Sequence, residues 1–379
     1  MIVRRIFAIC FVVLILFNII GCSGPHGVLR YEAEGERIVF PQKPDKPRYE
    51  YVGQLTGQDN IFAPKDESFF IKALKWVVGL YSSKKKPEVL QRPQTGVVDE
   101  ERGRIYVTDV SLQAVFVFDK PEGRLLIWDR ATKEGSGFLS PIGIALGDKG
   151  QVLVADSELG VVVRLDADGE PLGSFGAGIL ERPTGLARDA KTGKIYVSDT
   201  HAHNIKVFND VGNLLTTIGK RGIHDGEFNF PTFLSFHDDK LYVTDTMNFR
   251  IQVLTPDGKF LLKFGQLGLN VGDFPRPKGV TVDSEGNIYV VESYYDYLLI
   301  YNSVGDFLLP IGGTGHDIGQ FYLPAGVWSD SQDRIYVADM FNGRIMIFQY
   351  LSKSYLEKQK NQVVKTKAAG SPVESSNVK

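Results

Sequence analysis

Four histidines in this 379-residue chain lie in segments where their imidazole groups could share a ligand. His201 and His203 form a close pair, His224 follows in the next loop, and His316 occupies a similar glycine-rich segment. Neutral imidazole is a common zinc ligand, and catalytic zinc usually has three protein ligands and one open position. No His-Glu-x-x-His or comparable short spacing is present, and loop residues face solvent by default. We therefore expect no cofactor, and these four residues are the candidates for the alternative, a metal site.

A series of acidic residues ends six similar short runs. The runs read IYVTD, VLVAD, IYVSD, LYVTD, IYVVE and IYVAD, and their last residues are Asp109, Asp156, Asp199, Asp245, Glu292 and Asp339. Such a series could be mistaken for a catalytic ring. However, a carboxylate that follows a strand commonly accepts backbone N–H groups of the next turn. We therefore expect six turn caps.

Arginine, lysine and tyrosine gather in the same kind of segment. Arg182 and Arg276 each precede a proline that opens a predicted strand, and Lys278 follows such a proline. Arginine and tyrosine are enriched at recognition surfaces. Ordinary solvated loop residues are the alternative interpretation. The predicted residues for binding a ligand or partner are Arg182, Arg250, Arg276, Lys278, Tyr294 and Arg344.

These candidates are embedded in a repeat of roughly 45 residues, the length typical of a propeller blade. The clearest copy runs from Pro277 to Gly312 and contains four short runs rich in β-branched and aromatic residues, separated by turn residues. First, second and third strands occur six times, but only five fourth strands follow them. The segment from Tyr49 to Leu55 provides the missing one. We expect an all-β fold, a six-bladed β-propeller of four-stranded antiparallel blades, closed by this N-terminal strand so that no sheet edge stays open.

The repeats resemble the NHL-repeat family of six-bladed propellers. The family pattern is a strand ending in Asp, a short turn with Asn and Arg, and an I-x-V-F strand. Residues 245–254 match it with Asn248 and Arg250, and residues 339–348 match it with Asn342 and Arg344. The other blades keep only the hydrophobic frame. The resemblance covers roughly residues 48–351 and implies the fold more firmly than a function. It also implies that His201, His203, His224 and His316 share one face, where a three-His site would be similar to the zinc site of propeller amidating lyases.

The N-terminal residues 1–21 have the features of a bacterial lipoprotein signal peptide. Arg4 and Arg5 precede an apolar run that is short for a membrane-spanning helix and suitable for a signal peptide. The run ends in Ile19-Ile20-Gly21-Cys22, which resembles a lipobox. This resemblance implies lipidation of Cys22 and an anchored protein of the bacterial envelope. Ser23 in place of aspartate favours the outer membrane. An uncleaved signal anchor is the alternative.

Three further segments lie outside the regular repeat. Residues 22–47, with prolines three apart, are expected to form an extended tether. Within the propeller of residues 48–351, an insertion at 64–87 predicts a helix with a wide apolar surface that is covered by the propeller, a partner or the lipid interface. Residues 352–379 are expected to be disordered, with at most a turn or two of helix at the start.

Charge and channel composition complete the functional prediction. The net charge of −2 gives no signal for nucleic acid. The predicted inner strands read GVV, GIA, GLA, FLS, GVT and GVW, without the His, Asp, Asn or Glu that propeller enzymes direct into their channel. We therefore expect a lipid-anchored, non-catalytic scaffold that binds a protein of the envelope or an anionic ligand through its loops. The alternative is a lyase or lactone hydrolase with a metal at the channel mouth. The oligomeric state stays open.

Overall fold

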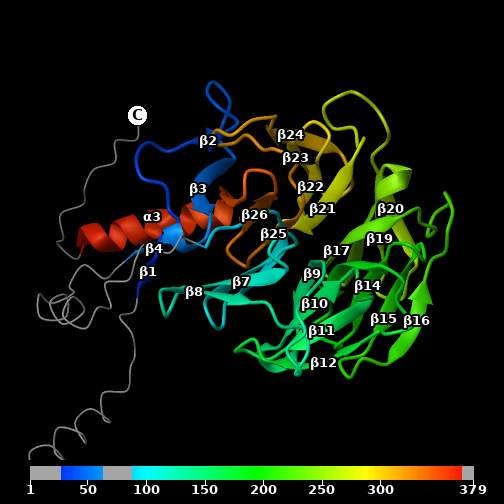
Figure 1. Ribbon diagram of the computed structural model, residues 1–379. Helices are drawn as coiled ribbons and strands as arrows, with labels where there is room; N and C mark the ends of the chain where they lie inside the picture. The colour runs from blue at the N-terminus through cyan, green and yellow to red at the C-terminus, as the bar shows by residue number, and fades with distance from the viewer. Residues whose placement is uncertain (1–26, 63–87, 369–379) are drawn as a thin grey trace, which may run out of the picture.

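Residues 27–62 and 88–368 are described by the structure, a computed structural model (Figure 1). The predicted signal peptide, Cys22 and the predicted helical insertion at 64–87 lie outside these ranges. Six sheets are arranged in a ring, and in each blade the first strand lies nearest the axis and the fourth lies at the rim. Among the described residues, no helix has both the length and the apolar character needed to span a membrane.

Blades 1 to 5 each use four consecutive strands of the chain. Blade 1 contains β5 (Pro93–Asp99), β6 (Arg104–Asp109), β7 (Ala114–Asp119) and β8 (Arg124–Trp128). Blade 2 contains β9 (Pro141–Leu146), β10 (Val152–Asp156), β11 (Val161–Leu165) and β12 (Pro171–Phe175). Blade 3 contains β13 (Pro183–Arg188), β14 (Ile195–Asp199), β15 (Asn204–Phe208) and β16 (Leu214–Ile218). Blade 4 contains β17 (Pro231–His237), β18 (Lys240–Asp245), β19 (Arg250–Leu254) and β20 (Phe260–Phe264). Blade 5 contains β21 (Pro277–Val282), β22 (Ile288–Glu292), β23 (Tyr297–Tyr301) and β24 (Phe307–Gly312).

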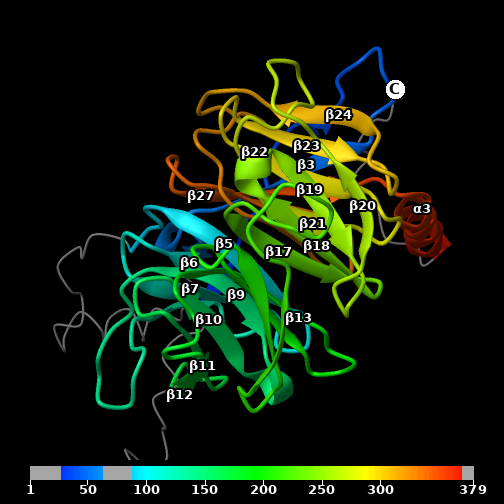
Figure 2. The same cartoon turned by 90° about the vertical axis from the view of Figure 1, so that its right-hand side faces the viewer.

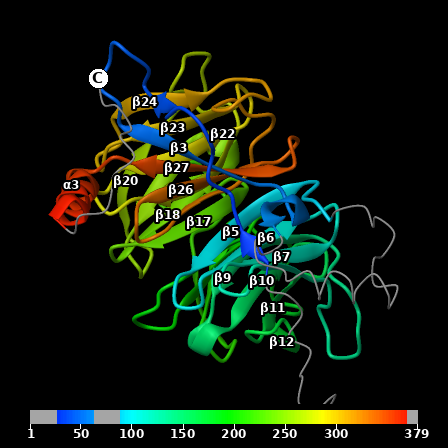
Figure 3. The same cartoon turned by 90° about the vertical axis from the view of Figure 1, so that its left-hand side faces the viewer.

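Blade 6 joins the two ends of the repeat region. It contains β25 (Val327–Ser329), β26 (Arg334–Asp339) and β27 (Arg344–Tyr350), followed at the outside by β3 (Tyr49–Leu55). Figure 3 shows β3 beside β27. The Tyr49 hydroxyl lies 3.1 Å from that of Tyr289 in blade 5, so the closing strand also contacts the neighbouring blade. The predicted count of six blades and the predicted closure by an N-terminal strand are confirmed.

The core consists of apolar layers between adjacent blades. Six clusters of buried side chains each combine residues of two neighbouring blades. Near the axis, glycine allows the inner strands to pack backbone against backbone. A Cβ atom on Gly143 would lie 2.3 Å from the carbonyl oxygen of Thr184, and one on Gly185 would lie 2.2 Å from that of Thr232. This close approach explains the glycine near the start of most inner strands.

The segments before and after the propeller differ from the expectations. Residues 27–47, expected to form part of a free tether, pack on the ring: β2 (Val39–Phe40) extends blade 6 beyond β3, and β1 (Val28–Leu29) pairs with β4 (Ile61–Phe62). Residues 353–368, expected to be mainly disordered, form helix α3 (Lys353–Ala368) at the edge of blade 6 (Figure 3). The Ser352 hydroxyl accepts the Tyr355 N–H at 3.1 Å and caps this helix, whose Lys, Glu and Gln residues have high helix propensity.

Three short 3-10 helices complete the described elements. They are η1 (Gln58–Asn60), η2 (Asp148–Gly150) and η3 (Thr246–Asn248). The last of these lies in the turn between the second and third strands of blade 4, on the face where the candidate residues gather.

Candidate binding face

Six buried carboxylates connect the loops of one face of the ring. Asp109 accepts N–H groups of Gln91 and Arg92 at 2.7 and 2.9 Å, from the loop that enters its blade. It also accepts those of Ser111 and Leu112 at 2.9 and 3.1 Å, from the turn after its own strand. In every other blade the corresponding acid accepts an N–H group of the entering loop, and Asp156 and Glu292 also accept N–H groups of their own turns. We call the surface formed by these turns and entering loops the loop face.

The predicted role as turn caps is confirmed for Asp109, Asp156 and Glu292, which accept backbone N–H groups of their own turns. Asp199 accepts N–H groups of the entering loop alone, whereas Asp245 and Asp339 bind Asn and Arg side chains that follow them. All six acids fix the loop that enters their blade. The acids are 0–1% exposed. Burial raises the pKa of Glu292, and it also raises the pKa of Asp339, while their hydrogen bonds act in the opposite direction. These carboxylates are occupied by backbone donors and serve the architecture of the loop face.

Two predicted binding residues, Arg250 and Arg344, also serve this architecture. Arg250 is 7% exposed; its Nε donates to Asp245 at 2.8 Å, and its other nitrogens donate to carbonyl oxygens of the loop entering blade 4. Arg344 is 8% exposed and bonds to Asp339 and to the loop entering blade 6 in the same way. Neither guanidinium group is available to a partner in this structure. We therefore withdraw both from the candidate site.

The four histidines do not converge on one point. The His203 ring is buried, and its Nδ1 accepts the Phe230 N–H at 3.1 Å. Burial, followed by the nearby Arg221, lowers the pKa of His203, which suits a neutral acceptor. His316 lies two junctions away around the ring, where its Nδ1 is 2.5 Å from Asn342 Oδ1. In residues 27–62 and 88–368, no group of three or more His, Cys, Asp or Glu side chains is placed to hold a metal ion.

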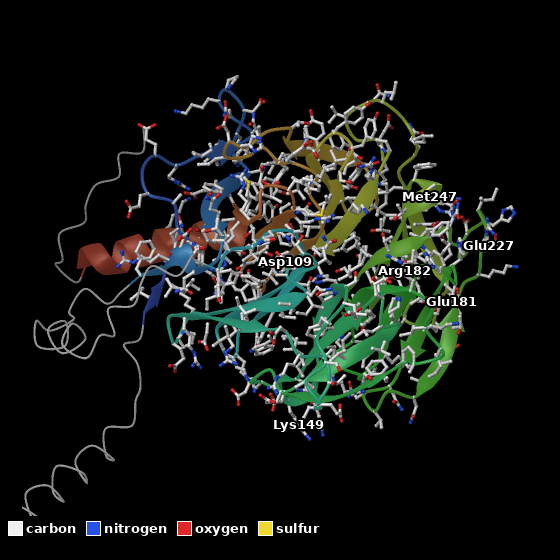
Figure 4. All side chains as sticks on the ribbon, in the orientation of Figure 1. Asp109, Lys149, Glu181, Arg182, Glu227 and Met247 are labelled. Carbon is white, nitrogen blue, oxygen red and sulfur yellow. The ribbon has the colours of Figure 1, made fainter. Side chains whose placement is uncertain are left out.

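The remaining predicted residues lie on the loop face, where the side chains of Arg182, Arg276 and Tyr294 are accessible and that of Lys278 is partly buried. Arg182 is partly exposed and forms an ion pair with Glu158 at 3.2 Å. Arg276 is exposed, and its guanidinium carbon lies 5.7 Å from the ring centre of Tyr294, which is 55% exposed. Lys278 is partly buried, and its carbonyl oxygen accepts the Thr244 hydroxyl at 2.6 Å. In Figure 4, Arg182 and Met247 lie on the same side of the molecule.

The mouth of the channel on this face is lined by hydroxyl groups and one cation. Thr184 Oγ1 lies 2.6 Å from Thr200 Oγ1, and Thr232 Oγ1 lies 2.7 Å from Thr246 Oγ1. Lys278 occupies the position of Thr184 and Thr232 in blade 5, directly after the strand-opening proline. Burial lowers the pKa of Lys278, and the positive charge of Arg276 lowers it further. An anionic group in contact with Lys278 would offset both the burial of its ammonium group and the repulsion from Arg276.

A cavity of the channel lies along the inner strands and opens on the opposite face. It has a volume of about 470 Å³ and is lined by inner-strand residues that include Phe233, Trp328 and His237. A second hollow of about 520 Å³ shares His237 and Ser329 with it and lies among the loops between first and second strands. Arg276, Lys278 and Tyr294 do not line either space. The candidate residues thus form a surface site.

The architecture defines a six-bladed β-propeller. Residues 180–208 match the sequence profile of the NHL repeat, so the chain is a propeller that carries this repeat. The match covers the whole of the first three strands of blade 3. A search of curated protein sequences finds no relative with significant similarity.

Solved structures with this fold include binding proteins and enzymes. An auxiliary nutrient binding protein from Bacteroides thetaiotaomicron is 13% identical with a TM-score of 0.55, covering 69% of this chain and 70% of that one. A gluconolactonase from Xanthomonas campestris is 14% identical with a TM-score of 0.54, covering 84% and 99%. A catalytically inactive virginiamycin B lyase from Staphylococcus aureus, with quinupristin, is 12% identical with a TM-score of 0.51, covering 87% and 97%. At these identities the likeness concerns the fold alone.

Proposed function

We propose that this chain is a non-catalytic binding scaffold of the bacterial envelope, anchored through lipid on Cys22, that holds a protein or anionic ligand on its loop face. One observation carries the proposal. Arg276 and Lys278 bring two positive charges to the entry of blade 5, and neither forms an ion pair with any residue that the structure describes.

The electrostatics favour an anionic group at this position. A partly buried ammonium group beside a second cation is unfavourable unless a negative charge compensates both. A carboxylate or phosphate that contacts Arg276 and Lys278 would form charge-assisted hydrogen bonds, which are stronger than neutral ones. Tyr294 beneath Arg276 adds aromatic surface, and such pairs are frequent at binding hot spots.

Intact cells that express the full chain provide the test. Arg276→Glu combined with Lys278→Met should abolish chemical crosslinking to the partner, because it removes both charges. Its control combines Lys149→Glu with Lys191→Met, since both lysines are exposed and lie in loops between first and second strands, on the opposite face. Crosslinked species that persist unchanged in the first variant would contradict the proposal. Stoichiometric zinc that is lost in His201→Ala would favour the enzyme alternative.

Membrane attachment is a separate part of the proposal. The lipobox resemblance of residues 19–22 supports it. Two or three acyl chains hold a protein more firmly than one, which gives only about 10⁴ M⁻¹. Wild-type protein should therefore need detergent for release and should incorporate labelled fatty acid, whereas Cys22→Ser should not. Absence of label in the wild type would exclude the anchor without affecting the binding face.

A further inference from the structure

The turns between second and third strands carry exposed apolar side chains at their tips in blades 4 to 6. The second residue after the acid forms the tip of each turn between second and third strands. In blades 1 to 3 this residue is polar or charged, whereas in blades 4 to 6 it is Met247, Tyr294 and Phe341. These three side chains are 49%, 55% and 49% exposed. The residue at the same turn position is therefore polar in blades 1 to 3 and apolar in blades 4 to 6.

The loops that enter blades 4, 5 and 6 extend the same apolar surface. Each loop contains a fully buried phenylalanine three residues before the strand-opening proline: Phe228, Phe274 and Phe321. Each also directs aliphatic side chains outward, with Ile223 at 69%, Leu269 at 83% and Ile318 at 41% exposed. The loop between β20 and β21, which carries Leu269, projects from the body of the ring (Figures 1 and 2). The buried anchors show that these loops are folded while their outward residues stay in water.

We call this surface the apolar arc, and its residues are Ile223, Met247, Leu269, Tyr294, Ile318 and Phe341. Exposed apolar residues scattered singly are normal, but a run that follows successive loops of one face marks an interaction site. Arginine lies at its edges. Arg276 is placed over Tyr294 at 5.7 Å and Arg92 over Phe341 at 5.5 Å, and neither has an ion-pair partner in the described part of the chain.

We propose that the apolar arc binds a protein segment that presents large apolar side chains flanked by aspartate or glutamate. This inference rests on the proposed function and specifies its partner. The apolar residues supply area to be buried, whereas Arg92 and Arg276 supply charges that acidic residues would complement. Tyrosine, phenylalanine, methionine and arginine are also the side chains enriched in the centres of protein interfaces.

The start of the described chain argues against a lipid surface as the occupant. Gly27 packs against the turn between β7 and β8, since a Cβ atom on Gly27 would lie 2.3 Å from the Gly123 carbonyl oxygen. That turn belongs to blade 1 and to the face opposite the loop face. The five residues from Cys22 to Gly27 span at most about 17 Å. A lipid on Cys22 would therefore hold this edge of blade 1 near the membrane, and the arc, centred on blade 5, would face away from it.

Peptide selection on the purified full-length protein tests the inference. A random peptide library displayed on phage should yield sequences that combine large apolar with acidic residues. Synthetic peptides of these sequences should bind Leu269→Asp at least tenfold more weakly than wild type. The matched control is Leu139→Asp, because Leu139 is 49% exposed on the loop face outside the arc, and its affinity should be unchanged. Both changes are at exposed sites, so equal thermal unfolding of the variants verifies the fold.

Several outcomes would overturn the inference. These are peptides without acidic residues, equal binding to both variants, or an arc occupied by something else. Binding to phosphatidylglycerol vesicles that Leu269→Asp removes would identify a lipid surface, and a dimer in sedimentation that this variant dissociates would identify a second copy. A crosslinked partner lost by Arg276→Glu with Lys278→Met but kept by Leu269→Asp would overturn the arc alone. A partner kept by both would overturn the proposed function as well.

Discussion

Replacing Arg250 with methionine should lower the free energy of unfolding by about 3–5 kcal/mol, the usual cost of breaking a buried ion pair. Methionine keeps much of the apolar stem but removes every donor. Asp245, which is 0% exposed, then loses its charged partner at 2.8 Å and keeps only neutral donors, the Asn229 N–H, Asn248 Nδ2 and Gln252 Nε2. The carbonyl groups of Ile223 and His224 lose their Arg250 donors too, whereas that of Glu227 keeps Gln252 Nε2 at 2.7 Å; all three belong to a surface loop and can bind water. The buried carboxylate therefore dominates the expected cost.

Urea unfolding followed by circular dichroism measures this effect. Arg276→Met is the control, because an exposed arginine contributes at most about 1 kcal/mol. The double variant Arg250→Met with Asp245→Asn should lose less than the sum of the two single variants, since the two residues interact directly. An Arg250→Met protein within about 1 kcal/mol of wild type would refute the structural role. Arg250 would then return to the candidate binding residues.

Four further predictions concern other parts of the ring. His203→Asp should keep the free energy of unfolding at neutral pH, because Asp296 accepts the Leu323 N–H at 2.8 Å in the same position of blade 5. His203→Ala lacks an acceptor, so its free energy of unfolding should be lower. The pKa of His203 is lowered on folding, so wild type should lose stability as pH falls below 6.5 and through the folded-state pKa, and a flat urea midpoint from pH 7 to 5 would contradict this. Lys278→Met should be more stable than wild type at pH 7, because charged Lys278 is disfavoured in the folded state. The difference in stability should disappear as pH rises through the lowered pKa toward 10.5. A difference that does not change with pH would argue against the desolvation of Lys278. Deleting residues 48–55 should expose the edge of β27 and cause aggregation in light scattering, whereas a monodisperse product would exclude the closing role of β3.

The sequence allows the ring to be predicted because its signals are local and repeated. Each strand is visible as an apolar run between turn residues, and six copies remove the ambiguity of any single one. The capping role of Asp109, Asp156 and Glu292 is predictable for the same reason, since a carboxylate can cap the turn that follows it, whereas the bonds of all six acids to the entering loops depend on the fold. The closing strand is also predictable, because a count of strands shows one missing at the end and one extra before the first blade.

Roles that depend on distant loops are harder to predict. From the sequence, Arg250 is predicted to be an exposed turn residue. Its burial is not predicted because the carbonyl groups that it binds lie more than twenty residues earlier in the chain. From the sequence, His203 is a candidate metal ligand, but comparison of the repeats indicates a structural role in its turn. Each blade has a residue with positive φ four positions after its acid, and this residue is glycine in Gly160 and Gly343 and aspartate in Asp296. The same position in blade 3 holds His203, which marks it as a turn residue.

Composition gives a poor prediction for segments whose structure depends on the ring. Residues 27–47 contain prolines and charges typical of a linker, yet β2 finds a partner in the outer edge of β3. Helix α3 contains few apolar residues, yet Tyr355 helps to line a hollow beside Tyr51 and Gln349 of blade 6. In both cases the propeller provides a surface that the local sequence does not describe.

Blade 5 is where the repeat departs most from its own pattern, and the departures coincide with the candidate site. Three blades follow a loop of the same glycine-rich form, but only blade 5 lacks the Asn and Arg that hold such a loop, with Tyr295 and Tyr297 in their places. Its entering loop is held by Asp273, which accepts the Asn270 N–H at 2.9 Å within the loop, and by the Tyr301 hydroxyl of blade 5, which donates to the Gly272 carbonyl oxygen at 2.7 Å. Natural sequences depart from local consistency mainly at functional sites. The blade in which Tyr295 and Tyr297 replace the buried Asn and Arg also carries Arg276 and Lys278. This coincidence supports the proposal that blade 5 is the centre of the binding face.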